Sequence, residues 1–424
     1  MPQPTSAPRQ FLTNLFENAV RTADPMRVVP NFLPPRPAGR LIVIGAGKAS
    51  ARMAEAVEQH YGPCEGLVIT RYGYARPCKG IEIVEAAHPV PDTKGELATR
   101  QLLDRVSNLG SGDTVLALIS GGGSALLCAP IDGLTLRDKR DLNRALLASG
   151  APIGQINIVR KHTSRVKGGQ LATACYPAQL ITLMISDVPG DDPSLIASGP
   201  TVGDDSTPQD AIAILDQYKI EISPQIRTAI TQHPNVVAKH DPRLRNNQNH
   251  IVAAPSLSLT TAAQIATRDG CEVQMLGDAL EGEARDLATE QAELAISLCP
   301  MVNDTGKPLL LLSGGECTVT RRGDGIGGPN AEFVLAAAIA LNGQPNIHVL
   351  ACDTDGVDGA AEVAGAYAGP DTLITALKQD IEPSVALANN DAHQFFEKIG
   401  GQIITGPTLT NVNDFRAILI CPES

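Results

Sequence analysis

The strongest constraint on the fold is a repeated order of short apolar runs, small-residue turns and helical stretches. The runs Leu41–Ile44 and Thr114–Ile119 are apolar at nearly every position, which is typical of strands buried on both faces of a parallel sheet. Asp92–Leu109 has the apolar spacing of an amphipathic helix, with Asp92 or Thr93 as a candidate cap. Strands that alternate with helices predict an α/β fold, with a parallel sheet covered by helices on both faces.

The alternation is interrupted once. A polar stretch at 232–249 precedes a second series, which begins with an expected strand at His250–Ala253 and continues to one at His348–Ala351. A chain of 424 residues is long enough for two domains, each with its own core. We therefore expect domains at 1–240 and 245–424, joined by a connector.

Composition excludes several classes of protein. The longest apolar run, Phe333–Leu341, is too short to span a bilayer. The net charge is −12 and there is no tryptophan, whereas nucleic-acid binders are usually basic. The nine cysteines include no Cys-x-x-Cys pair, which favours reduced thiols. With no signal-peptide pattern at the start, the sequence predicts a cytoplasmic protein that binds neither nucleic acid nor membrane.

Small residues gather at Gly45–Ser50, Ser120–Ser124, Ser313–Glu316 and Gly325–Asn330. Three of these segments directly follow an expected strand, and the fourth precedes an expected helix. Ligands bind at the carboxyl ends of strands in such sheets, and glycine lets backbone N–H groups reach an anion. Any one segment is explained equally well as a tight turn, but four favour a phosphate or carboxylate site. We expect the substrate to be bound by Ser120, Gly121, Gly122 and Ser124, and the nucleotide by Gly45, Gly47, Ser313, Gly314, Gly315, Glu316 and Asn330.

The first glycine segment fits neither common nucleotide motif. Ile42 stands where a Walker A loop needs its first glycine. Gly45-x-Gly47-x-x-Ser50 lacks the third glycine of the dinucleotide fingerprint, and the next strand ends at Thr70-Arg71 without an acid for the ribose. Lys48 falls at a helix N-terminus, where a cation is unfavourable by some tenths of a kcal/mol unless an anion binds beside it. Lys48 is therefore the first candidate for catalysis.

Two loops concentrate carboxylates after expected strands, at Ser186–Asp192 and Cys352–Gly359. Such clusters repel unless a cation lies between them, and Mg²⁺ binds through one or two carboxylates together with phosphate oxygens. One carboxylate could also act as a general base on a hydroxyl, and simple turns are the alternative. The candidate metal ligands are Asp187, Asp191, Asp353 and Asp355, with Asp187 also a candidate catalytic residue.

The densest basic segment is Asn157–Gly169. Arginine there could bind a carboxylate or phosphate in a bidentate manner, although a solvated helix face is the alternative. The candidate substrate-binding residues are Arg160, Lys161, Arg165 and Lys167. Anion-binding turns, a lysine, acidic loops and a basic clamp are what phosphoryl transfer requires, but they do not name the substrate.

Together these segments resemble the glycerate 2-kinase family of the MOFRL type, whose members are also labelled hydroxypyruvate reductase of tartrate utilisation. The resembling motifs occur in the expected order along nearly the whole chain, at 45–50, 88–92, 120–125, 159–162, 167–169, 186–191, 198–201, 313–316, 327–330 and 353–359.

The resemblance implies an ATP- and Mg²⁺-dependent kinase that phosphorylates D-glycerate at its 2-hydroxyl. It also implies a larger Rossmann-like N-terminal domain, a smaller C-terminal α/β (MOFRL) domain and an active site in the cleft between them. Lys48 matches the family's essential lysine, and Asp187 lies in the matching acidic loop. The sequence departs from the family at Pro329, where many members have arginine; Arg321 or Arg322 could supply that charge.

Two other functions stay open at this stage. NAD(P)H-dependent reduction of hydroxypyruvate is weakened by the missing third glycine and ribose acid. A non-catalytic regulator that binds sugar phosphates would leave both acidic loops without a role. The sequence is compatible with a homodimer but does not determine the oligomeric state.

Overall fold

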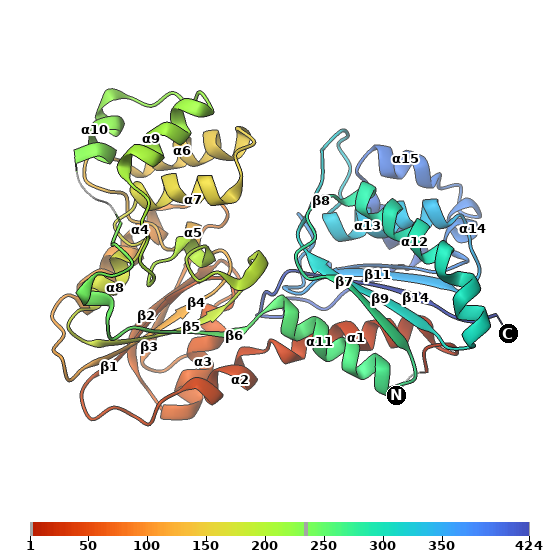
Figure 1. Ribbon diagram of the computed structural model, residues 1–424, viewed down its shortest axis with the longest axis horizontal. Helices are drawn as coiled ribbons and strands as arrows, with labels where there is room; N and C mark the ends of the chain where they lie inside the picture. Colours follow the sequence, from red (N-terminus) through yellow and green to blue (C-terminus); the bar gives the residue numbers. More distant parts are fainter. Residues whose placement is uncertain (1–2, 233–235, 424) are drawn as a thin grey trace. The chain divides into compact units, whose positions relative to one another are not determined.

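The computed structural model describes residues 3–232 and 236–423 and divides the chain into two compact units (Figure 1). The N-terminal unit is Pro25–Val252, and the C-terminal unit combines Ala253–Ser424 with the residues up to Asp24. The chain thus passes between the units twice, at 24–25 and at 252–253, rather than once near 240 as expected. Residues 233–235 of the expected connector lie outside the described residues.

Helix α1 (Pro8–Thr22) is part of the C-terminal unit because its apolar stripe packs there. Phe11, Leu15 and Phe16 are fully buried in one cluster with residues of α11 (Pro255–Arg268) and of the C-terminal sheet. Ser258 Oγ also donates a hydrogen bond of 3.0 Å to the Ala19 carbonyl. The periodicity predicts correctly that this helix buries one face, but it does not say which core receives that face.

The N-terminal unit is built on a six-stranded sheet with the strand order β3-β2-β1-β4-β5-β6, which is the order of the Rossmann fold. The pairs β2/β3, β1/β2, β1/β4 and β4/β5 are parallel, so the expected parallel α/β architecture is confirmed here. The strand expected to open the C-terminal series, β6, instead lies at the edge of this sheet. The strands are β1 (Leu41–Ala46), β2 (Glu65–Arg71), β3 (Ile81–Ala86), β4 (Thr114–Ile119), β5 (Gln179–Ile185) and β6 (Gln248–Ala253).

Helices cover both faces of this sheet. One face packs against α4, α5 and α8, while α3 packs against β1, β2 and β4. Helix α4 begins as expected at Asp92, whose carboxylate accepts a hydrogen bond from Gly95 N at 2.9 Å. The α-helices of the unit are α2 (Pro25–Val28), α3 (Ser50–Tyr61), α4 (Thr93–Val106), α5 (Gly123–Leu126), α6 (Leu136–Ala148), α7 (Ile153–His162), α8 (Gln170–Cys175), α9 (Pro208–Gln217) and α10 (Pro224–Gln232). Its short 3₁₀ helices are η1 (Val29–Phe32), η2 (Pro189–Asp191), η3 (Ile196–Ser198) and η4 (Pro242–Leu244).

Four of these helices form a separate cluster within the unit. Figure 1 shows α6, α7, α9 and α10 gathered above the N-terminal sheet in this view. Their apolar faces share a core of their own, which includes Leu142, Val159 and Ile214.

The C-terminal unit contains a six-stranded sheet with the order β13-β12-β11-β14-β9-β7. Its β7/β9 pair is parallel, whereas β9/β14, β14/β11, β11/β12 and β12/β13 are antiparallel. The sheet is therefore mixed, because β14, from the end of the chain, lies between β9 and β11. The six strands are β7 (Glu272–Gly277), β9 (Leu309–Gly315), β11 (Ile347–Asp353), β12 (Gly365–Ala368), β13 (Gln402–Ile403) and β14 (Asp414–Ile420). Two short strands, β8 (Gly282–Glu283) and β10 (Cys317–Thr318), pair with each other in a separate two-stranded sheet.

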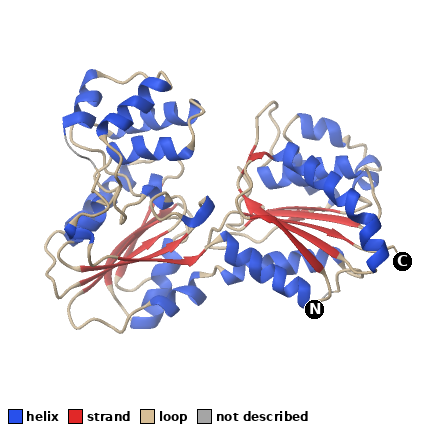
Figure 2. Ribbon diagram, viewed as in Figure 1, coloured by secondary structure: helices blue, strands red, loops and turns tan. Residues whose placement is uncertain are grey.

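This second sheet is the middle of three layers, as Figure 2 shows. Alternate residues of its central strands point to opposite faces: Leu311 and Val349 pack in the cluster of α12 and α13, and Leu312 and Leu350 in that of α1 and α11. None of the helices in the described residues is long and apolar enough to cross a membrane. The other helices are α12 (Ala284–Thr305), α13 (Pro329–Leu341), α14 (Thr372–Leu377), α15 (Pro383–Ala388) and α16 (Ala392–Ile399).

Candidate active site

Two glycine-rich turns meet where the strand order of the N-terminal sheet reverses. One follows β1 and the other follows β4, and these strands are parallel neighbours. Lys48 N donates to the Gly121 carbonyl at 2.8 Å, and Ala49 N donates to Ser120 Oγ at 3.1 Å. The reversal point is where open α/β sheets bind their ligands. The structure thus brings these two segments together, and the ligand contacts expected of them stay predictions.

The glycines in these turns allow a very close approach of the two segments. A Cβ on Gly47, whose φ is +148°, would lie 2.1 Å from Ser120 Oγ. A Cβ on Gly122, at φ +80°, would lie 3.0 Å from the His88 ring and 3.3 Å from Lys48 Cγ. Gly45 differs, because it lies inside β1 where a Cβ would meet the Leu118 carbonyl at 2.3 Å. Close strand packing therefore accounts for Gly45, while Gly122 brings Lys48 and His88 together.

Lys48 is half-buried and directly precedes Ala49, the N-cap residue of α3. This is the position at a helix N-terminus that the sequence predicts. A lysine there, beside backbone N–H groups, forms a concentration of positive charge suited to a phosphate.

A pocket of about 210 Å³ adjoins these turns. Gly122, Ser124 and His88 line it on one side, and one face of α6 lines it on another. That face carries residues three and four apart, as helical geometry requires. The residues contributed by α6 are Lys139, Leu142, Asn143, Leu146 and Leu147.

Three cationic side chains line the pocket. Lys139 Nζ donates to the carbonyl and hydroxyl of Thr163 at 2.9 and 3.2 Å, and Lys167 Nζ donates to the Leu127 carbonyl at 2.8 Å. Arg160 Nε donates to Asn143 Oδ1 at 2.9 Å. Burial lowers the pKa of Lys139 to about 8, and burial together with the charge of Lys139 lowers that of Lys167 to about 7.

The structure divides the predicted basic clamp. Arg160 and Lys167 line the pocket, but Lys161 points elsewhere, into a buried ion pair with Asp204 at 2.5 Å. Arg165 is exposed and pairs with Asp132 at 3.4 Å. Neither Lys161 nor Arg165 lines the pocket, so the four basic side chains do not lie together there, and their contacts with substrate stay predictions. Arg160 and Lys161 diverge because successive helical residues point about 100° apart, whereas Arg165 and Lys167 follow the end of α7 at His162.

A short hydrogen-bonded chain supports the pocket wall. Ser124 Oγ lies 2.7 Å from Ser198 Oγ, which in turn donates to Asn157 Oδ1 at 3.0 Å. Ala197 and Ser198 have φ values of +51° and +62°. Two successive non-glycine residues in the left-handed backbone conformation store strain, which is common beside functional sites.

The first acidic loop lies at the same edge of the sheet. It follows β5, the parallel neighbour of β4, so Asp187 comes near the end of the strand beside the Ser120 turn. Asp191 Oδ1 is buried and has no hydrogen-bond partner among the described residues. A carboxylate oxygen in that state is suited to a cation. In the described part of the chain, no three His, Cys, Asp or Glu side chains form a group able to hold a metal.

In the C-terminal unit, the segment expected as a glycine turn is strand. Ser313, Gly314 and Gly315 end β9 and pair with Arg416, Phe415 and Asp414 of β14. The Gly314 carbonyl accepts hydrogen bonds from Leu280 N at 3.0 Å and from Arg416 Nη2 at 2.6 Å. The expectation of a turn here is therefore wrong, and the part these residues take in nucleotide binding stays a prediction, as it does for exposed Glu316.

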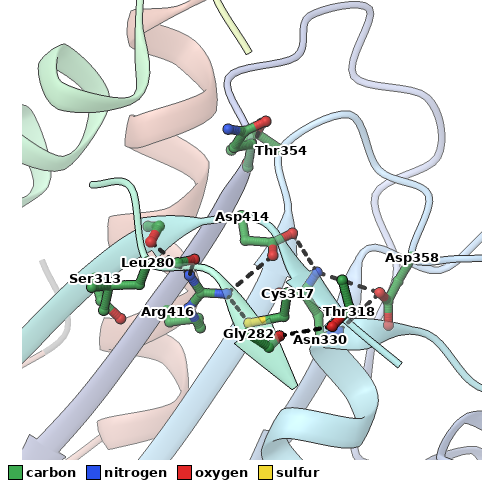
Figure 3. A network of polar contacts seen from close by, with 12 residues as sticks. Leu280, Gly282, Ser313, Cys317, Thr318, Asn330, Thr354, Asp358, Asp414 and Arg416 are labelled. Carbon is green, nitrogen blue, oxygen red and sulfur yellow. Dashed lines mark hydrogen bonds and ion pairs between the residues drawn. The ribbon is translucent and has the colours of Figure 1, made fainter. Parts of the chain in front are cut away.

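Asn330 belongs to the buried polar network drawn in Figure 3. Its Nδ2 donates to Asp414 Oδ1 at 2.7 Å, and Asp358 accepts hydrogen bonds from Asn330 N and Ala331 N at 3.0 and 2.8 Å. Asp358 thereby caps α13 from the second acidic loop. Burial raises the pKa of Asp414 to about 6, although the adjacent Arg416 opposes this. The network gives Asn330 a structural role whether or not it binds nucleotide.

Asp353 and Asp355 shape their own loop. Asp353 Oδ1 accepts a hydrogen bond from Asp355 N at 2.8 Å, and Asp355 Oδ1 accepts one from Val357 N at 2.9 Å. Pro329 is the first residue of α13, where a missing N–H costs nothing. The metal-binding role of the two aspartates, and the replacement of the family arginine by Arg321 or Arg322, stay predictions.

Sequence reasoning missed Lys139, the Asn157–Ser198 support and the apolar wall of the pocket. Lys139 lies among Arg137, Asp138, Arg140 and Asp141, a composition that indicates a solvated helix face. The one available signal was its spacing, because Lys139 is three residues before Leu142 and seven before Leu146 on the apolar stripe.

The fold and site define a two-unit α/β protein with two glycine-rich turns and a half-buried lysine at the switch point of a Rossmann-like sheet. Residues 11–231 match the family described as a domain of unknown function, DUF4147, and residues 309–414 match the MOFRL family. The chain belongs to the family that combines these two domains, as the resemblance predicts.

Relatives cover nearly the whole chain. D-glycerate 2-kinase of Thermotoga maritima is 38% identical over 415 residues, which are 97% of this chain and 98% of that protein. A crystal structure of glycerate kinase from the same organism matches with a TM-score of 0.88 at 37% identity, over 98% of this chain and 99% of that one. A protein of Agrobacterium vitis with the provisional name hydroxypyruvate reductase is 48% identical over 418 residues, 97% of this chain and 94% of its own. These matches confirm the two-domain α/β fold.

Proposed function

We propose that this chain is a glycerate 2-kinase, which transfers the γ-phosphoryl group of ATP to the 2-hydroxyl of D-glycerate and releases 2-phosphoglycerate and ADP. The observation that carries the proposal is the junction of the two glycine turns. There Lys48 lies beside a pocket that is lined by cations and is the size of a small organic acid. Full-length similarity to D-glycerate 2-kinase supports it.

In this function Lys48 neutralises charge on the transferred phosphoryl group. The reaction forms little covalent chemistry with the protein, so positioning and charge stabilisation supply most of the catalysis. The turn at Ser120–Ser124 orients the acceptor, and Asp187 accepts the proton of the 2-hydroxyl or holds the metal. Arg160 and Lys167 face the substrate, whereas Lys161 forms a buried ion pair with Asp204 and Arg165 lies at the surface.

Mg²⁺ would lie at the loop after β5, with Asp187 and Asp191 as ligands. The buried, unpartnered Oδ1 of Asp191 fits this assignment. A bound Mg²⁺ would neutralise charge on the phosphate oxygens. On the sequence pattern, Asp353 and Asp355 of the C-terminal unit stay candidate metal ligands, and Gly45, Gly47, Ser313–Glu316 and Asn330 stay candidate nucleotide-binding residues.

Reduction of hydroxypyruvate is disfavoured by the chemistry of the first turn. Ser50, where the fingerprint needs its third glycine, is buried with its Oγ 3.1 Å from Ser120 Oγ. Thr70 at the end of β2 donates to the Gly47 carbonyl at 3.2 Å and offers no carboxylate to a ribose.

The test uses purified full-length protein with D-glycerate, ATP and Mg²⁺, followed by the release of ADP. We expect ADP release that depends on D-glycerate and stops with EDTA. A parallel reaction follows NADH and NADPH oxidation with hydroxypyruvate and is expected to stay at background. NAD(P)H oxidation without glycerate-dependent ADP release would refute the proposal.

A further inference from the structure

The pocket beside Lys48 gathers positive charge without a balancing acid. Among the described residues, no carboxylate pairs with Lys139, Arg160 or Lys167, whose partners are carbonyl, hydroxyl and amide oxygens. Besides burial, the groups in the described ranges that act on the pKa of these lysines are Cys128 and Arg160, and for Lys167 also Lys139; none of them is a carboxylate. Buried charges are normally paired, so this cluster lacks its partner.

The rest of the chain shows that this arrangement is an exception. Lys161 and Arg416 are the other two cationic side chains buried as deeply in the described residues. Lys161 lies 2.5 Å from Asp204, and Arg416 lies 3.1 Å from Asp414. A fold that pairs these two cations with acids leaves Lys139 and Lys167 for an anion from outside the chain.

The shape of the pocket limits that anion. Its volume of about 210 Å³ is below the range of roughly 300–1,000 Å³ typical of larger ligands, so a three-carbon acid fits better than a nucleotide. Leu142, Leu146 and Leu147 form an apolar wall with Pro89 and Pro91. A carboxylate is therefore directed to the cationic end.

We propose that Lys139, together with Lys167 and Arg160, binds the carboxylate of D-glycerate and directs its 2-hydroxyl toward Lys48. This inference rests on the proposed function. It assigns Lys139 as a substrate-binding residue and makes small 2-hydroxycarboxylates the substrate class of the pocket.

The two lysines also predict proton uptake on binding. With pKa values of about 8 and 7, Lys139 and Lys167 are partly neutral at pH 8, and a bound carboxylate favours their charged forms. The other titratable or charged groups that face them are Arg160, His88 and the Cys128 thiol. Burial raises the pKa of Cys128, on which Glu96 and Arg140 also act, so this thiol stays neutral.

The experiment is calorimetric titration of the full-length protein with D-glycerate, without ATP, at pH 8 in two buffers of different ionisation enthalpy. Wild type is expected to take up about one proton per ligand. Lys139→Met should weaken binding about 10- to 100-fold, the scale of a lost hydrogen bond to a charged group, and should lower the uptake. Arg144→Gln is the matched control, because Arg144 lies on the same helix, is exposed and pairs with Asp141; it should bind as wild type does.

A second variant keeps the test decisive if Lys139→Met does not fold. Asn143→Asp changes no shape but places a carboxylate within the pocket, next to Arg160. It should fold, as judged by an unreduced melting temperature, and should weaken D-glycerate binding about tenfold by occupying the cations.

The outcomes separate this inference from the proposed function. Unchanged D-glycerate affinity in Lys139→Met and Asn143→Asp, with glycerate-dependent ADP release intact, overturns the carboxylate site alone. A loss of affinity for inorganic phosphate or ADP, but not for D-glycerate, assigns the cluster to phosphate and also overturns it. Absence of both D-glycerate binding and ADP release in wild type overturns both proposals.

Discussion

Replacing Lys161 tests whether burial and pairing identify which basic residues hold the fold. Lys161 Nζ lies 2.5 Å from Asp204 Oδ2, and the two side chains are 4% and 13% exposed. Removing one partner of a buried ion pair typically costs about 3–5 kcal/mol. Ser206 N and Oγ still donate to Asp204 Oδ1, so we expect Lys161→Met to cost about 3 kcal/mol, at the lower end of that range.

The loss should be visible in thermal and urea unfolding. The N-terminal unit spans Pro25–Val252, and in domains of that size about 1 kcal/mol shifts the melting temperature by roughly 2–4 °C. Lys161→Met should therefore melt about 6–12 °C lower, with an unchanged KM for D-glycerate. Lys239→Met is the control, since its pair with Asp205 is long, at 3.5 Å, and 57% exposed on each side; it should change stability by less than about 1 kcal/mol.

The stability lost in Lys161→Met should vary with pH in a defined direction. Although burial alone would raise it, hydrogen bonds from Lys161 and Ser206 hold the pKa of Asp204 below its usual value. In wild type this stabilisation is present above the unfolded pKa and is lost as pH falls through the folded one. Without Lys161 the pKa of the buried Asp204 carboxylate should rise. The difference in unfolding free energy between wild type and Lys161→Met should therefore be largest at neutral pH and become smaller in acid. A Lys161→Met variant with the melting temperature of wild type and a tenfold higher KM for D-glycerate would refute the reasoning. Lys161 would then be a substrate-binding residue.

Three further predictions concern the glycine turns and the acidic loop after β5. Lys48→Ala should lower kcat about a hundredfold while the circular dichroism spectrum stays unchanged, because one preorganised charge is lost; near-normal turnover would contradict its catalytic role. Asp191→Asn should raise the Mg²⁺ concentration for half-maximal rate about tenfold, and an unchanged Mg²⁺ titration would remove Asp191 from the metal site. Gly47→Ala, whose Cβ would lie 2.1 Å from Ser120 Oγ at φ +148°, should lower the free energy of unfolding in urea by about 2 kcal/mol or more; wild-type stability would show that the turns are not tightly packed.

Much of the N-terminal unit could be predicted because its signals are local. Leu41–Ile44 and Thr114–Ile119 are apolar on both faces, and each ends in glycines, which predicts buried parallel strands and ligand-binding turns. Lys48 was found because its charge is wrong for a helix N-terminus unless an anion is present.

What could not be predicted depends on partners distant in the sequence. The apolar stripe of α1 could pack in the core of either unit. Its packing against α11 depends on tertiary contacts that the local sequence does not specify. The C-terminal sheet is mixed because β14 lies between β9 and β11 and because β12 pairs antiparallel with β11, and these pairings depend on contacts that the sequence pattern does not specify. Lys161 and Lys167 belong to the same basic segment, and the sequence does not distinguish their roles. In the structure Lys161 pairs with Asp204, whereas Lys167 lines the pocket.

The central claim is phosphoryl transfer to the 2-hydroxyl of D-glycerate, and ³¹P NMR of the reaction mixture tests it most directly. Wild-type protein with D-glycerate, ATP and Mg²⁺ should produce the resonance of 2-phosphoglycerate in step with that of ADP, and Lys48→Ala should produce about a hundredfold less in the same time. A resonance of 3-phosphoglycerate in its place, or release of inorganic phosphate without a phosphorylated acid, would contradict the account.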